Sequence, residues 1–110
     1  MLSKKDVVEI NKGFSTGKLM NESSLDYAVK TTARSRNWLR SAALLARSIL
    51  IDHAFEDGNK RTAAAAIMLL MDLNDIQFNP EEIPKVVVKI LKKNITSLTE
   101  IERCIKDAIK

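Results

Sequence analysis

One nine-residue segment, His53 to Arg61, contains most of the side chains that could do chemistry. It reads His-Ala-Phe-Glu-Asp-Gly-Asn-Lys-Arg and combines a potential base, two carboxylates, a glycine and two cations. Histidine ionises near neutral pH, so His53, the only histidine of the chain, could take a proton from an attacking hydroxyl group. Few structural loops need this set of residues, and we therefore expect a catalytic loop here.

The second half of the segment has the features of an anion site at the start of a helix. We expect Asn59 to be the N-cap, so that Lys60 and Arg61 lie beside unpaired N–H groups and the positive end of the helix dipole. Gly58 would let the backbone approach an anion closely, and Asp57 could hold a magnesium ion that bridges phosphate oxygens. Such a site could neutralise a transferring phosphoryl or nucleotidyl group.

Each of these residues also has an ordinary structural explanation. A single histidine at a helix end usually caps the helix or packs against it. Lys60 and Arg61 could be solvated charges, and the Asp-Gly-Asn before them is a common turn composition. The spacing of these residues from His53 and Phe55 favours the chemical interpretation.

The elements around the segment are predicted to be helices. The chain contains only three glycines and two prolines, which favours long helices over many short strands. The third predicted helix starts near Trp38 and delivers His53 at its C-terminal end, and the fourth is apolar all round over 63–73, as expected at the centre of a bundle. The other predicted helices start after Ser3, near 21–24, over 84–93 and after Ser97.

The composition is that of a single globular domain, 1–110, with 45% hydrophobic and 29% charged residues. A lone cysteine, Cys104, and the lack of an apolar signal segment predict a cytoplasmic protein. The longest uncharged apolar run, 63–71, is too short to cross a membrane. The net charge is +4, but the eighteen Lys and Arg are spread along the chain, so the charge does not by itself predict nucleic-acid binding.

The segment resembles the signature of the Fic/Doc (death-on-curing) family, H-x-F-x-[D/E/N]-[G/A]-N-[G/K]-R. The matching positions are His53, Phe55, Asp57, Gly58, Asn59, Lys60 and Arg61. This resemblance implies an all-α fold, a compact Fic/Doc-type bundle of about six helices with the motif between a buried helix and the central helix.

The resemblance also implies an activity, that of a toxin-like transferase that uses ATP or another nucleotide and Mg²⁺ to modify a hydroxyl group of a target protein. His53 would be the general base, Phe55 would anchor the loop in the core, and Asp57 would bind the metal. Nucleotide phosphates would be bound by the four residues that follow, Gly58, Asn59, Lys60 and Arg61.

Three positions favour the Doc branch of the family. Ala54 replaces the proline common in Fic members, Lys60 stands where AMP-transferring members usually have glycine, and Ala64 stands where they carry a second arginine. Doc phosphorylates a translation elongation factor. The resemblance therefore implies phosphorylation of a protein hydroxyl, with AMP transfer as the alternative.

Two protein partners are implied in the same way. The target would be held by strand-like pairing with a flexible stretch upstream of the motif, 14–20. A separate antitoxin would restrain the activity, because the nearest match to the family's inhibitory S/T-x-x-x-E-G/N motif, Thr96 to Glu100, is followed by Ile101.

Other classes of function are compatible with the sequence. A non-catalytic basic helical module would bind nucleic acid with a strong salt dependence and without ATP. A pseudo-enzyme would keep the pocket as an interaction surface, although intact His53 and Asp57 argue against it. We expect no membrane partner and no direct nucleic-acid partner, and the sequence predicts no oligomeric state.

Overall fold

The structure is a computed structural model that describes residues 2–110. Within this range the chain forms six α-helices and two short helical segments of different pitch, and no strand. The helices are α1 (Lys4–Lys12), α2 (Glu22–Thr32), α3 (Trp38–Ala46), α4 (Asn59–Leu73), α5 (Ile83–Lys92) and α6 (Leu98–Lys106). The π-helical segment η1 (Arg47–Ile51) extends α3, and the 3₁₀ segment η2 (Pro80–Glu82) precedes α5. The predicted all-α fold is confirmed.

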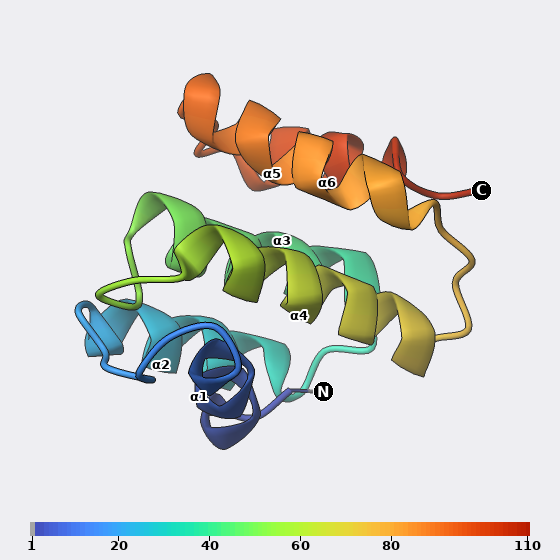
Figure 1. The fold of residues 1–110 in the computed structure, drawn as a ribbon. Helices are drawn as coiled ribbons and strands as arrows, with labels where there is room; N and C mark the ends of the chain where they lie inside the picture. The colour runs from blue at the N-terminus through green and yellow to red at the C-terminus, as the bar shows by residue number, and fades with distance from the viewer. Residues whose placement is uncertain (1) are drawn as a thin grey trace.

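The helices lie in three layers (Figure 1). α3 and α4 form the middle layer, with α1 and α2 on one side and α5 and α6 on the other. Side chains such as Leu45, Ile49, Ile67 and Ile101 are fully buried between the layers. The radius of gyration is 12.3 Å, close to the ~13 Å expected of a compact chain of this length. None of the helices in 2–110 is long and apolar enough to cross a membrane.

Polar side chains start most of the helices, as the sequence predicts. Ser3 caps α1, Asn21 caps α2, Asn37 caps α3 and Ser97 caps α6, each by accepting a hydrogen bond from a backbone N–H in the first turn. These bonds satisfy donors that have no partner within the helix. The helix predicted over 84–93 is α5, shifted by one residue.

The start of α4 differs from the prediction. The residue before the helix is Gly58, with a φ of +76°, and Asn59 is already the first helical residue. The prediction of Asn59 as N-cap is therefore wrong, because its side chain is used elsewhere. Only glycine adopts such a backbone conformation without steric cost. The predicted position of α4 is otherwise correct, since it lies in the middle layer and contacts α1, α3 and α5.

Candidate active site

His53 follows an irregular end of the third helix. The π-helical η1 ends at Ile51, and the N–H of the next residue, Asp52, donates to the Arg47 carbonyl at 3.1 Å. His53 then adopts a left-handed conformation with a φ of +52°. A positive φ is uncommon for a residue with a side chain, and π-helical turns are frequent at functional sites. The Asn21 side chain, at the start of α2, donates to the Asp52 carbonyl at 3.1 Å, and the Ser24 hydroxyl donates to the Asp52 carboxylate at 2.6 Å. The start of α2 therefore holds the residue immediately before the histidine.

The loop between His53 and α4 is fixed to the core by Phe55 and Asn59. The Phe55 side chain is 1% exposed. The Asn59 carboxamide pairs with the backbone of Phe55: its oxygen accepts from the Phe55 N–H at 3.0 Å, and its nitrogen donates to the Phe55 carbonyl at 2.8 Å. The Asn59 side chain therefore closes the loop, and what it presents to an anion is its backbone N–H.

Gly58 lies close to α1 and the loop after it. A Cβ atom at this position would lie 3.2 Å from the Asn11 side-chain nitrogen and 3.2 Å from the Ser15 Cβ. The absence of a side chain thus makes room for α1 and the loop after it. Together with the positive φ, this close approach requires glycine at position 58.

The first turn of α4 has free donors and free cations. The Thr62 N–H makes the first helical bond, to the Gly58 carbonyl at 2.9 Å, whereas the N–H groups of the three residues before it have no acceptor within 2–110. The Lys60 and Arg61 side chains are exposed, and no carboxylate of the described chain lies within 4.0 Å of either. Backbone donors, the helix dipole and two unpaired cations therefore favour an anion at this helix end.

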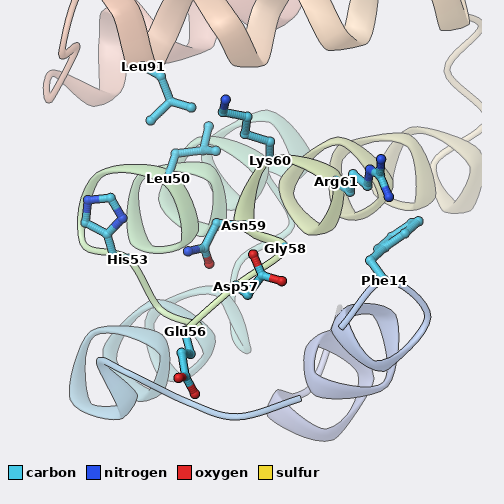
Figure 2. A pocket seen from close by; sticks show the side chains of 10 residues that line it. All are labelled: Phe14, Leu50, His53, Glu56, Asp57, Gly58, Asn59, Lys60, Arg61 and Leu91. Atoms are coloured by element: carbon cyan, nitrogen blue, oxygen red, sulfur yellow. The ribbon is translucent and has the colours of Figure 1, made fainter. Parts of the chain in front are cut away.

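A cavity of about 540 Å³ lies over this helix start. Figure 2 shows His53 on the loop side and Lys60 and Arg61 on α4, with Asp57 between them. The remaining lining residues are Phe14, Leu50, Glu56, Gly58, Asn59 and Leu91. Six of the seven matched signature positions thus line one cavity, and the seventh, Phe55, is buried beneath it.

Asp57 is the carboxylate best placed for a metal ion. Its side chain is exposed at the cavity and accepts one long hydrogen bond, from the Ser15 hydroxyl at 3.3 Å. The other nearby carboxylate, Glu56, also lines the cavity, but it pairs with Lys18 at 3.3 Å. No group of three or more His, Cys, Asp and Glu suited to a metal occurs in 2–110. Mg²⁺ often binds through one or two carboxylates together with substrate phosphates, so Asp57 fits an ion that arrives with a nucleotide.

The loop between α1 and α2, residues 13–21, runs beside the motif like a short strand. The Glu56 N–H donates to the Lys18 carbonyl at 3.0 Å, and the Met20 N–H donates to the Ala54 carbonyl at 2.8 Å. Leu19 forms an isolated antiparallel bridge with Phe55, and its own N–H and C=O have no partner within 2–110. The stretch predicted as flexible is therefore paired along one edge and open along the other.

One polar residue at the site was missed by the sequence analysis. Asn11, in α1, is completely buried. Its side chain donates to the Asp57 carbonyl at 2.9 Å and to the Thr62 hydroxyl at 3.0 Å, and it accepts from the Gly17 N–H at 2.8 Å. The available signal was its spacing, because Asn11 follows the buried Val7 by one helical turn and so lies on the inner face of α1.

Comparison with known proteins agrees with the geometry. A family model described as the Fic/DOC family matches residues 4–71, which is more than half of the chain. The match includes α1 to α3 and most of α4, and with them all seven signature positions. No curated protein matches the chain significantly.

Proposed function

Because the chain belongs to the Fic/DOC family, we propose that it phosphorylates a hydroxyl group of a target protein with ATP and Mg²⁺. The family is known for protein-modifying transferases, which generally use a nucleotide with a metal ion. The observation that carries the proposal is the convergence of a base, a carboxylate, free helix N–H groups and two cations on one cavity.

The free donors of α4 would bind and orient the nucleotide. The N–H groups of the first turn would take phosphate oxygens, with Lys60 and Arg61 neutralising the charge that develops as the phosphoryl group moves. Asp57 would hold a magnesium ion on the same phosphates, where the ion supplies further charge neutralisation. The protein's main contribution is thus positioning and electrostatic stabilisation.

His53 would act on the target hydroxyl. A ring nitrogen takes the hydroxyl proton while the hydroxyl oxygen bonds to the γ-phosphorus. The bond from that phosphorus to the oxygen bridging to the β-phosphate breaks, and ADP leaves. The imidazole is exposed and makes no hydrogen bond within 2–110, so it is available to an incoming side chain.

The choice of phosphoryl over AMP transfer rests on two side chains. Lys60 stands where AMP-transferring relatives usually carry glycine, and it adds a mobile cation that could hold the nucleotide with its γ-phosphate towards His53. Ala64 leaves one fewer cation for a nucleotide in the opposite orientation. AMP transfer is the alternative outcome of the experiment below.

The target and the restraint are proposed from the same family. Fic/Doc proteins act on protein targets and are commonly toxins paired with antitoxins. The open edge at Leu19 could pair with an extended target segment that presents its hydroxyl group to His53. A translation elongation factor is the proposed target in the cytoplasm, and a separate antitoxin chain the proposed restraint. Thr96 to Glu100 does not line the cavity, which fits a restraint that comes from another chain.

The experiment that tests the proposal uses ATP labelled on either the γ- or the α-phosphate. The purified chain is incubated with cell lysate, Mg²⁺ and each label, alongside the Lys60→Gly variant. We expect label on protein from the γ-position only. Label from the α-position alone would overturn the kinase assignment, and no label from either would contradict transfer from ATP.

A further inference from the structure

We infer that Asn11 is a positioning residue that couples the loop after α1 to the phosphate-binding end of α4. The inference rests on the proposed function, because it concerns how the same site responds to a nucleotide. Asn11 itself does not line the cavity, so its effect has to pass through the groups that it holds.

The contacts of Asn11 join three separate segments. Two donor bonds from its side-chain nitrogen reach the Asp57 carbonyl and the Thr62 hydroxyl, on either side of the free N–H groups of α4. The Thr62 hydroxyl in turn donates to the Gly58 carbonyl at 2.8 Å. The side-chain oxygen of Asn11 accepts from the Gly17 N–H, in the loop after α1.

The hydrogen bond between Asn11 and Thr62 is shielded from water. Asn11 and Thr62 are both 0% exposed, so water cannot readily replace a lost bond between them. The side-chain oxygen and nitrogen of a single carboxamide cannot move independently. A displacement of Asp57 and Gly58 is therefore transmitted to Gly17, and ordering of one segment favours ordering of the other.

The two segments have a second connection, which provides an internal reference. The Lys18 and Ala54 carbonyls accept from Glu56 and Met20 without involving Asn11. These bonds join the loop to the half of the motif nearer His53, whereas Asn11 reaches the half nearer the phosphates. Loss of Asn11 should thus change the effect of the nucleotide on amide exchange at Gly17 more than its effect on amide exchange at Met20.

Amide hydrogen exchange of the full-length chain, with and without ATP and Mg²⁺, tests this inference. In the wild type, the nucleotide is expected to slow exchange in the first turn of α4 and also at Gly17, which does not line the cavity. In Asn11→Ala, exchange at Gly17 without nucleotide should be about tenfold faster, and the nucleotide should no longer slow it. Protection of the first turn of α4 should remain detectable.

Two further variants keep the test decisive. Thr62→Val removes one of the two acceptors of the Asn11 nitrogen while preserving shape, and it should weaken the nucleotide-induced protection of Gly17. It serves as the test if Asn11→Ala does not fold. Ser41→Ala is the matched control, because Ser41 is equally buried and its hydroxyl has no partner within 2–110. It should leave the response at Gly17 unchanged.

The outcomes separate the two proposals. Undiminished nucleotide-induced protection of Gly17 in Asn11→Ala, or in Thr62→Val if the first variant is unfolded, would overturn the role of Asn11. No protection of the first turn of α4 in the wild type would instead contradict the proposed function. A loss of thermal stability without a change in the response to nucleotide would assign Asn11 a structural role only.

Discussion

The first turns of α1 and α4 differ in what satisfies their free N–H groups. At α1 the Ser3 hydroxyl accepts from the Asp6 N–H at 3.1 Å, and the Asp6 carboxylate accepts from the Ser3 N–H at 2.8 Å. At α4 the N-cap is Gly58, and within 2–110 no side chain caps the helix and the two cations that follow, Lys60 and Arg61, have no carboxylate partner. A capping box thus satisfies donors at the start of α1, whereas the N–H groups at the start of α4 have no side-chain cap within 2–110.

The capped start of α1 contributes to stability, whereas the start of α4 keeps free the donors that the proposed function needs. A side-chain cap stabilises a helix by about 1 kcal/mol, and four of the six α-helices in 2–110 have one. α4 and α5 lack this contribution, and at α4 Asn59, a good cap by residue type, bonds the loop backbone instead. A residue such as Asn59, which does not follow its local preference, is typical of a functional site.

The largest expected effect comes from removing the proposed base or the proposed metal ligand beside the start of α4. His53→Ala should lower the rate of label transfer by about 10²–10⁴, because the base is lost. Asp57→Ala should lower it similarly, because the carboxylate proposed to hold the metal is lost. Expression of the wild-type chain without a partner should slow growth, and expression of either variant should not. Equal toxicity of all three chains would show that the effect is not enzymatic.

The next effect concerns the loop closed by Asn59. Asn59→Ala removes both hydrogen bonds to Phe55 and should lower the free energy of unfolding by about 2 kcal/mol, as measured by urea denaturation. Activity should fall as well, since the loop carries His53 and Asp57. Asn74→Ala, at the other end of α4, removes one bond to the Leu70 carbonyl and is the matched control. An equal loss of activity in the control would contradict a local role for Asn59.

A smaller effect is expected from adding a side chain at position 58. Gly58→Ser places a preferred capping residue before α4, yet it should destabilise the chain by about 1–2 kcal/mol. The cause is the φ of +76° and the 3.2 Å approach of a Cβ to Asn11 and Ser15. Thermal denaturation measures the change. A gain in stability would mean that α4 can accept an ordinary cap, and the contrast with α1 would disappear.

The smallest effect is expected from removing the side-chain cap at the start of α1. Ser3→Ala should cost about 1 kcal/mol at neutral pH and leave nucleotide binding unchanged. Hydrogen bonds from the Ser3 backbone N–H and with its hydroxyl lower the pKa of the Asp6 carboxyl from its usual 3.8. Because the folded-state pKa is the lower one, this stabilisation is present above pH 3.8 and is lost as the pH falls through the lowered value. Denaturation of the wild type and of Asp6→Ala at neutral and acidic pH tests this, because the carboxylate carries the pH-dependent part. A cost of Asp6→Ala that is as large in acid as at neutral pH would be inconsistent with it.

Much of the fold could be predicted from the sequence, because helix starts are local. Ser3, Asn21 and Ser97 lie where polar residues precede apolar periodicity, and the structure places caps there. The placement of the signature residues around one cavity also follows from a short contiguous motif.

The details that the sequence did not reveal depend on contacts between distant segments. The bond from Asn11 to Asp57 spans 46 positions, and no local pattern predicts it. The space that requires glycine at position 58 is created by Ser15 and Asn11, on another segment. Asn59 was mistaken for a cap because its residue type suits a cap equally well, and only the fold shows that Phe55 is its partner.

The most direct test of the central claim is an NMR titration of the full chain with ATP and Mg²⁺. If the open start of α4 is the phosphate site, amide signals within 53–64 should shift most, and those of the capped first turns of α1 and α6 should stay unchanged. Arg61→Ala should weaken binding by about tenfold, since one unpaired cation is lost. A titration that shifts no signal between 53 and 64 would contradict the assignment of this helix end as the active site.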